Sequence, residues 1–299
     1  MPESPDSPEF GRVVSAMVSP MRPGGSLDLD AAAALATALV DAGHDGLVVS
    51  GTTGESPTTS DTEKMQLLRS VVDAVGSRAR VTAGVGTNDT AHTIELAQQA
   101  QGAGASGLLV VTPYYNKPPQ EGVLAHFRAV ADATDLPVLL YDIPGRTGIP
   151  LETGTLLRLA EHPRIRGVKD AKGDLWSATK VMAATDLLWY SGDDAMNLAL
   201  LASGATGIVG VTSQVAPRPY AAMVAAAGKG DFERVRELHR MLVPLVDAVM
   251  NLTQGAIMAK AGLVATGALA SATVRLPLIE ASAEQRTALE DALSRTQLS

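Results

Sequence analysis

The four residues Leu108-Leu109-Val110-Val111, at the centre of the apolar run Gly107–Thr112, decide the fold. They are apolar without alternation, which is the pattern of a β-strand buried on both faces, as in a parallel sheet covered by helices. Similar runs recur along the chain, each followed by a polar or glycine-rich turn and an Ala/Leu-rich stretch. The predicted strands are Val13–Val18, Gly46–Ser50, Arg80–Gly84, Gly107–Thr112, Pro137–Tyr141, Ile165–Lys169, Leu187–Ser191 and Thr206–Val211.

The stretches between these runs have helical starts and stops. Asp28–Ala42 ends at Gly43, and Thr90–Ala103 ends at Gly104. Ser60 or Asp61 can cap another helix, with Glu63 placed for a capping box. An uninterrupted series of eight βα units predicts an α/β protein with a (β/α)8 TIM barrel. A doubly wound open sheet is the alternative.

Further helical patterns follow the eighth strand, at Asp231–Met250, Gln254–Ala265 and Ala283–Ser294, and predict a C-terminal helical appendage. We therefore expect a disordered lead-in at 1–9, a barrel at 10–225 and a C-terminal helical region at 226–299.

Composition excludes several functional classes. The chain has 299 residues, a formal net charge of -8, 46% hydrophobic and 19% charged residues, and no Cys. The acidic balance argues against a nucleic-acid partner, and the lack of Cys excludes disulfides and thiolate catalysis. No apolar stretch is long enough to span a membrane, and the N-terminus has no basic and apolar signal pattern. We expect a cytoplasmic protein.

The active sites of such barrels lie at the carboxyl ends of the strands, and Lys169 ends the run Ile165-Arg166-Gly167-Val168-Lys169. If Lys169 faces the barrel interior, burial lowers its pKa, and a neutral amine can form a Schiff base with a carbonyl. The alternative is a lysine that extends from the strand end into water. Lys172, in a predicted loop, is interpreted as a solvated charge.

Other polar residues follow the predicted strands. Tyr114, Tyr115 and Tyr141 are three of only five tyrosines, and a phenol can relay protons near a carbonyl. The turn Gly51-Thr52-Thr53-Gly54 can present hydroxyl and N–H groups to a carboxylate. Arg146, in a turn after the fifth strand, could bind a carboxylate through two hydrogen bonds.

Some signals do not support a site. Gly102-Ala-Gly-Ala-Ser-Gly107 fits the dinucleotide pattern G-x-G-x-x-G but precedes a strand, so we interpret it as a helix end and turn. The five histidines are scattered and predict no metal site. Asp193-Asp194 is interpreted as a helix N-cap.

Together the motifs resemble the dihydrodipicolinate synthase family, within the pyruvate-dependent class I aldolases. The motifs that carry the resemblance are GTTGESPT (51–58), TPYYNKP (112–118), LLYDIPGRTG (139–148), GVKDAKGD (167–174), YSGDD (190–194) and GATGIVGVTS (204–213). The resemblance implies condensation of pyruvate with L-aspartate 4-semialdehyde to 4-hydroxy-tetrahydrodipicolinate, the first committed step of lysine and diaminopimelate biosynthesis. It implies no cofactor and no metal, and a homotetramer built as a dimer of dimers.

The family also implies roles for single residues. Lys169 matches the Schiff-base lysine. Thr52, Tyr115 and Tyr141 match a proton relay, in which the tyrosine at 115 enters the neighbouring subunit's site. The substrate-binding positions are Thr53 for the carboxylate of pyruvate, Arg146 for the carboxylate of the aldehyde substrate, and Gly192 and Val209 beside the lysine.

Relatives that are inhibited by lysine bind it with histidines and a glutamate. Here Asp61 and Lys64 replace the histidines and His92 replaces the glutamate. The carboxylate partner for a ligand ammonium is therefore missing, and we expect weak or no inhibition by L-lysine.

Three alternatives stay open. N-acetylneuraminate lyases and 2-keto-3-deoxy sugar acid aldolases share the lysine and tyrosine, but Arg146 favours a substrate with a carboxylate. A non-catalytic keto-acid-binding barrel and an open-sheet nucleotide-binding protein are the others.

Overall fold

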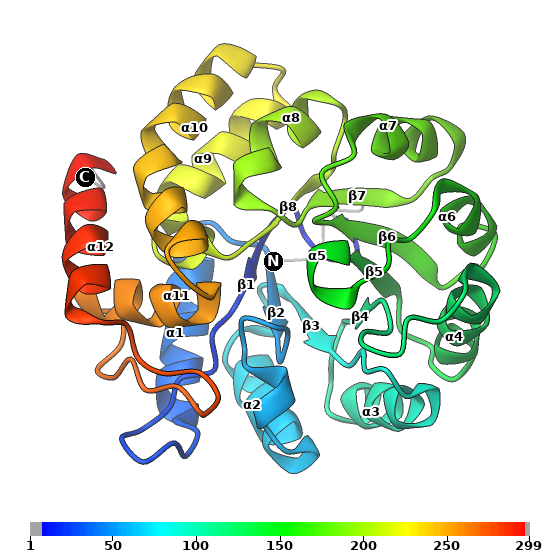
Figure 1. The fold of residues 1–299 in the computed structure, drawn as a ribbon, viewed down its shortest axis with the longest axis horizontal. Coiled ribbons are helices and arrows are strands. Elements are labelled where there is room, and N and C mark those ends of the chain that lie inside the picture. Colours follow the sequence, from blue (N-terminus) through cyan, green and yellow to red (C-terminus); the bar gives the residue numbers. More distant parts are fainter. Residues whose placement is uncertain (1–7, 297–299) are drawn as a thin grey trace.

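The computed structural model describes residues 8–296 and contains a closed barrel of parallel strands in the order β1 to β8 (Figure 1). This confirms the predicted (β/α)8 fold. Each predicted strand is present within two residues at either end. The bounds are β1 Val13–Ala16, β2 Gly46–Val49, β3 Arg80–Gly84, β4 Gly107–Val111, β5 Val138–Asp142, β6 Ile165–Asp170, β7 Leu188–Ser191 and β8 Gly207–Gly210.

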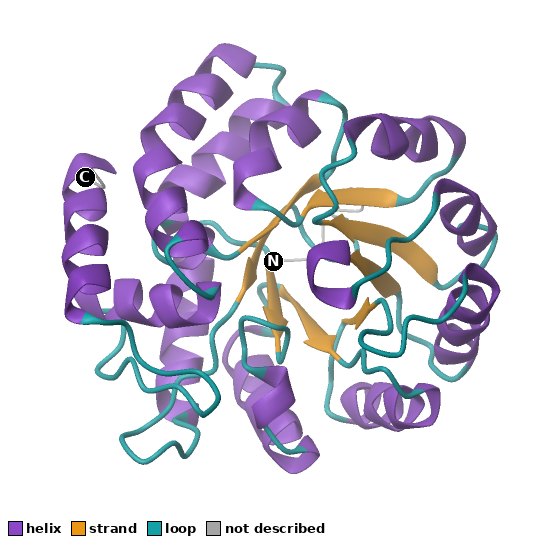
Figure 2. Ribbon diagram, in the orientation of Figure 1, coloured by secondary structure: helices purple, strands orange, loops and turns teal. Residues whose placement is uncertain are grey.

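Helices surround the barrel on the outside (Figure 2). They are α1 Leu29–Asp41, α2 Asp61–Val75, α3 Thr90–Gly102, α4 Gln120–Asp132, α5 Pro144–Thr147, α6 Thr153–Leu159, α7 Leu175–Ala184, α8 Asn197–Ala202, α9 Pro217–Gly228, α10 Phe232–Val246, α11 Gly255–Ala265 and α12 Ala283–Thr296. Short turns of 3-10 helix are η1 Ser56–Thr58, η2 Asp194–Met196 and η3 Thr212–Gln214, and η4 (Asp247–Asn251) is a π-helical turn.

Helix ends follow the local signals of the sequence. Ser60 caps α2, and the Glu63 carboxylate accepts a hydrogen bond from the Ser60 backbone N–H, which completes the predicted capping box. Helix α3 ends at Gly102, and Gly104 has a φ of 90°, a conformation that favours glycine. The G-x-G-x-x-G stretch is therefore a helix end and turn, as predicted.

The amino-terminal end of the barrel is closed by aromatic side chains. Phe10 is buried and meets the ring of Tyr190 edge-on, with 6.1 Å between the ring centroids. The Tyr190 hydroxyl donates a hydrogen bond to the Gly11 carbonyl oxygen (2.8 Å). These contacts pack the centre of this end, and the active sites of such barrels lie at the opposite end, where the strands finish.

The C-terminal helices lie on one side of the barrel, with α10 packed against α9 and α12 (Figure 1). The expected boundary at residue 225 falls inside α9, the helix of the last βα unit. Of the expected lead-in, residues 1–7 lie outside the described residues, and Glu9 pairs with Arg166 (3.0 Å). Within residues 8–296 no helix combines the length and apolar character needed to cross a membrane.

Candidate active site

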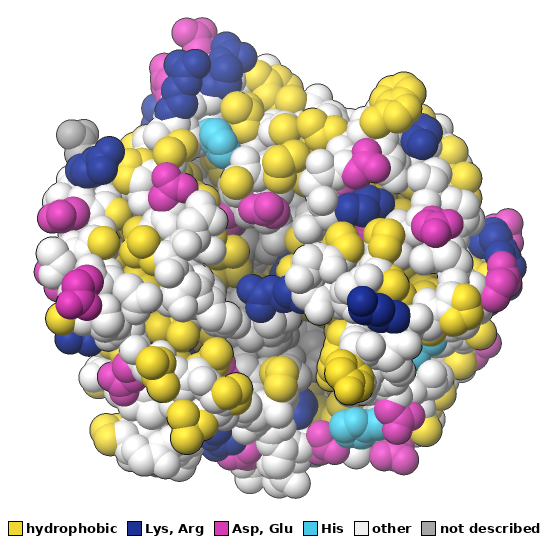
Figure 3. Space-filling view, viewed as in Figure 1, with side chains coloured by type: hydrophobic (Ala, Val, Ile, Leu, Met, Phe, Trp, Pro, Cys, Tyr) yellow, Lys and Arg dark blue, Asp and Glu magenta, His cyan; other side chains and the backbone are white. Residues whose placement is uncertain are grey.

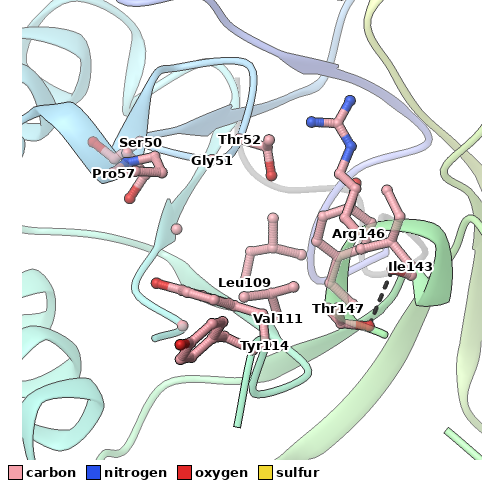
Figure 4. A pocket seen from close by; sticks show the side chains of 15 residues that line it. Ser50, Gly51, Thr52, Pro57, Leu109, Val111, Tyr114, Ile143, Arg146 and Thr147 are labelled. Atoms are coloured by element: carbon pink, nitrogen blue, oxygen red, sulfur yellow. Dashed lines mark hydrogen bonds between the residues drawn. The ribbon is translucent and has the colours of Figure 1, made fainter. Parts of the chain in front are cut away.

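A cavity of about 340 Å³ opens at the carboxyl end of the strands. This face of the molecule is hollowed near its centre, with basic and hydrophobic side chains around the hollow (Figure 3). In Figure 4, Ser50 and Pro57 lie on one side of the cavity, Arg146 and Ile143 on the other, and Val111 between them. The lining residues are Ser50, Gly51, Thr52, Ser56, Pro57, Gly84, Gly86, Leu109, Val111, Tyr114, Tyr115, Tyr141, Ile143, Arg146 and Thr147.

Lys169 lies in β6 with only 3% of its surface exposed. Register pairs it with Tyr141 of β5, and its Nζ lies over the tyrosine ring, 4.2 Å from the centroid. Burial lowers the pKa of Lys169 to about 8; the charge of Asp194 opposes this shift and that of Arg146 adds to it. Lys169 therefore does not extend into water, and its amine is more readily neutral than that of an exposed lysine.

Tyr141 lines the cavity and also contacts the Lys169 amine. Burial raises the pKa of Tyr141 to about 12, while the charge of Arg146 and a hydrogen bond with Thr52 oppose the rise. The phenol is thus protonated at neutral pH and has a hydroxyl partner. Such a pair can pass a proton between the buried amine and the cavity.

The loop after β2 brings Thr52 to the cavity wall. Ser50 and Glu55 flank it with φ values of 55° each, which are unfavourable for residues other than glycine. The Glu55 N–H closes the turn on the Thr52 carbonyl oxygen (3.1 Å). Thr53 is buried and does not line the cavity.

The loop after β4 contributes both neighbouring tyrosines. Tyr114 is partly exposed, whereas Tyr115 is 88% exposed and has a φ of 71°. An aromatic side chain held in a left-handed conformation and directed outward is costly for an isolated chain.

Arg146 lies in the short helix α5 over the barrel opening (Figures 1 and 4). The helix begins with Pro144, and Gly148 ends it with a φ of 81°. Thr147 Oγ1 donates to the Ile143 carbonyl oxygen (3.1 Å). The guanidinium has no hydrogen bond or ion pair within the described part of the chain, so it can bind an anion that enters the cavity.

Gly192 directly follows β7, and Val209 lies in β8. A Cβ atom on Gly192 would lie 2.7 Å from Cγ and 3.0 Å from Cε of Lys169, so only glycine leaves room for the lysine side chain. Val209 in β8 is fully buried and pairs with Val14.

The structure thus brings Thr52, Tyr115, Tyr141 and Arg146 to one cavity, and Lys169 lies against both Tyr141 and Gly192. Thr53 and Val209 are buried nearby without reaching the cavity. No cluster of His, Cys, Asp or Glu side chains suited to a metal ion occurs among residues 8–296.

The interpretation of Lys172 as a solvated charge is wrong. The Lys172 Nζ lies 3.3 Å from Asp142 Oδ2 and donates a hydrogen bond to the Leu151 carbonyl oxygen (3.1 Å). Burial raises the pKa of Asp142 to about 6, and the Leu151 N–H and Lys172 oppose the rise. The carboxylate next to the strand end attracts the lysine inward.

Sequence reasoning missed the electrostatic partner of Lys169. Asp193 caps η2 as predicted, accepting from the Ala195 N–H (3.0 Å). Asp194 is instead buried and accepts from the backbone N–H of Thr212 (2.7 Å). Asp194 directly follows the capping residue Asp193 in YSGDD, and nothing in that motif indicates that only the second carboxylate is buried.

The residues that align with a lysine-binding cleft form a second cluster. Asp61 accepts a hydrogen bond from His92 Nε2 (2.9 Å) and pairs with Lys64 (3.6 Å). The hydrogen bond from His92 lowers the pKa of Asp61. The Asp61 carboxylate therefore already has two side-chain partners, Lys64 and His92.

A buried lysine at a strand end, a neighbouring tyrosine and an arginine at the opening define the class: a lyase of the lysine-dependent aldolase type on a (β/α)8 barrel. The comparisons with known proteins agree. The profile of the Dihydrodipicolinate synthetase family matches residues 9–296. The 4-hydroxy-tetrahydrodipicolinate synthase of Kineococcus radiotolerans is 62% identical over 280 residues, covering 94% of this chain and 91% of that protein.

Solved structures give the same result. A dihydrodipicolinate synthase from Cyanidioschyzon merolae with lysine bound has a TM-score of 0.94 and 39% identity, over 98% of this chain and 100% of that one. The chloride-inhibited enzyme from Acinetobacter baumannii, complexed with pyruvate, has a TM-score of 0.93 and 34% identity, over 96% and 99%. The chain belongs to the Dihydrodipicolinate synthetase family, which confirms the resemblance of its motifs.

Proposed function

We propose that this chain condenses pyruvate with L-aspartate 4-semialdehyde to 4-hydroxy-tetrahydrodipicolinate and water, the first committed step of lysine and diaminopimelate biosynthesis. Family membership supports this reaction. The observation that carries it is the buried Lys169 amine, with its pKa lowered to about 8, against the Tyr141 ring. An amine in this state attacks a ketone.

The proposed sequence begins when Lys169 attacks the keto carbon of pyruvate and water leaves, which forms an imine. A methyl proton then leaves and an enamine forms. The enamine carbon attacks the aldehyde, whose oxygen takes up a proton. The amine of the second substrate finally attacks the imine carbon, closes the ring and releases Lys169.

Each of these steps moves a proton, and we assign the transfer to Thr52, Tyr141 and Tyr115. Tyr141 has the central position because it touches the lysine and hydrogen-bonds to Thr52. Its pKa of about 12 makes the neutral phenol its resting form. The phenol can therefore donate a proton and take it back within one turnover.

Carboxylates on both substrates need cationic or N–H partners. Arg146, unpaired at the opening, is assigned to the carboxylate of the aldehyde substrate, and Thr53 in the buried loop to that of pyruvate. Gly192 and Val209 form the wall beside the lysine. A sugar acid places hydroxyl groups where this arginine presents a bidentate donor, so Arg146 favours the semialdehyde.

We further propose a cytoplasmic homotetramer, a dimer of dimers. Tyr115 is the assigned contribution to the neighbouring subunit's site, which its exposure and left-handed backbone support. A second surface is available at the start of α7, where Leu175 is 36% and Trp176 71% exposed. Two separate contacts are what a dimer of dimers requires.

The test of the reaction is borohydride reduction with pyruvate, followed by peptide mass mapping. The peptide containing Lys169 should gain the reduced pyruvate adduct in the wild type and in Lys180→Ala, a control that removes an exposed lysine of α7. Lys169→Ala should show no adduct and no turnover. An unlabelled Lys169 peptide in the wild type, or faster turnover of N-acetylneuraminate or a 2-keto-3-deoxy sugar acid than of the semialdehyde, would overturn the assignment.

A further inference from the structure

Helix α11 contains a single charged residue, Lys260, in the apolar stretch GAIMAKAGLVA. Its side chain is fully buried. The Nζ donates hydrogen bonds to Glu55 Oε1 and to the Thr273 carbonyl oxygen (2.6 Å). Glu55 is also buried, so a buried ion pair joins Lys260 of the C-terminal region to the loop that carries Thr52 and Thr53.

The second oxygen of the same carboxylate is bonded as well. Glu55 Oε2 accepts from the backbone N–H of Arg275 (2.9 Å). The Arg275 guanidinium donates to the Thr58 carbonyl oxygen (2.7 Å) and pairs with Glu63. Residues 273–275 therefore hold the segment 55–58 at both of its ends.

The backbone conformation of Glu55 explains why the segment 55–58 needs these contacts. Its φ of 55° is unfavourable for a residue with a side chain, and its N–H donates to the Thr52 carbonyl oxygen (3.1 Å). Strained conformations persist only when surrounding contacts determine them. The loop also lines the cavity with Gly51, Thr52 and Ser56.

Stability alone is a poor reason to bury this pair. Removing two charges from water costs about as much as their attraction returns, and well-packed neutral side chains often serve equally well. What the pair supplies is a fixed geometry, because a carboxylate accepts from Lys260 on one oxygen and from Arg275 on the other.

We propose that Glu55 is a positioning residue for the reaction: through Lys260 and Arg275 it fastens the strained turn that presents the Thr52 hydroxyl to Tyr141. Glu55 does not line the cavity and acts through Thr52. This inference rests on the proposed function. Displacement of a catalytic group by about 1 Å can lower a rate about 100-fold, so a loosened turn has a measurable effect.

Glu55→Gln and Glu55→Ala test the proposal. Glutamine keeps the volume but has one oxygen, so its amide NH2 faces either Lys260 or the Arg275 N–H. Alanine removes both contacts. We expect kcat to fall about tenfold for Glu55→Gln and further for Glu55→Ala. The amount of adduct on Lys169 after full equilibration with saturating pyruvate should stay near the wild-type level, because a misplaced Thr52 slows proton transfer without changing the imine equilibrium.

The matched control is Tyr190→Phe, which removes a buried hydrogen bond at the closed end of the barrel. It should lower the melting temperature while kcat stays within about twofold of the wild type. If Glu55→Ala does not fold because Lys260 is left unpaired, Glu55→Gln/Lys260→Met carries the same test without a buried charge.

Loss of kcat in the Glu55 variants with normal adduct formation supports the positioning role. A kcat loss no greater than that of Tyr190→Phe, or an equilibrated adduct level that falls in parallel with kcat, overturns it. In both of these cases the wild type still forms the Lys169 adduct and turns over, so the proposed function stands. An unlabelled wild type would instead overturn the function and this inference with it.

Discussion

Replacing Gly192 by alanine should disable Lys169 without touching it chemically. The added Cβ would lie 2.7 Å from Lys169 Cγ and 3.0 Å from Cε, whereas carbon atoms pack at about 3.5–4.0 Å. The lysine side chain must therefore move by roughly 1 Å. The φ of Gly192 lies outside the left-handed region, so alanine adds no backbone strain of its own.

A displacement of that size at a nucleophile lowers a rate about 100-fold, equivalent to about 2.7 kcal/mol of barrier. We expect kcat/KM for pyruvate to fall by this factor, together with the rate of borohydride trapping. The control is Gly154→Ala in α6, where a Cβ meets nothing within 4 Å. A folded Gly192→Ala enzyme with kcat/KM within about threefold of the wild type would refute the steric argument.

Three further predictions use the same site. Since the amine reacts when neutral and the pKa of Lys169 is about 8, the rate of borohydride trapping with pyruvate alone should rise with pH through that value. Arg146→Gln removes a positive charge that lowers the pKa of Lys169, so the rise should move to higher pH. An unchanged pH profile would contradict the electrostatic effect of Arg146 on Lys169. Mixing inactive Lys169→Ala and Tyr115→Phe subunits should restore activity, because hybrid dimers contain one complete site if Tyr115 crosses the interface. The steady-state rates of refolded mixtures measure this effect. No gain in rate over the separate variants would place Tyr115 in its own subunit's site. Because Asp61 already pairs with His92, about 1 mM L-lysine should change the initial rate by less than about twofold, and strong inhibition at that concentration would show that another group binds the ligand ammonium.

The fold was predictable because its strands are buried on both faces. Runs such as Leu108-Leu109-Val110-Val111 carry that requirement in contiguous residues, and all eight strands lie where such runs occur. Their ends differ from the prediction by at most two residues, since pairing with neighbouring strands sets them. Of the polar residues that follow these strands, Thr52, Tyr115, Tyr141 and Arg146 line one cavity, whereas Thr53 does not.

Pairs that join distant parts of the chain were not predictable in this way. Glu55 and Lys260 are 205 residues apart, and neither shows periodicity or spacing that relates it to the other. One signal was present, because a single lysine in the apolar helix α11 needs a buried partner. Only the folded structure identifies that partner as Glu55, on the loop that carries Thr52.

Two buried lysines in one protein show why residue type does not determine chemistry. Burial lowers the pKa of both Lys169 and Lys260. Lys260 has a carboxylate in direct contact, and its ion pair favours the charged form, in which the amine has no free electron pair. Lys169 has an aromatic ring in contact and only the more distant charge of Asp194, so deprotonation leaves no carboxylate unpaired beside it. The same side chain is thus an ion-pair partner in α11 and the proposed nucleophile in β6, because the groups in contact with the two amines differ.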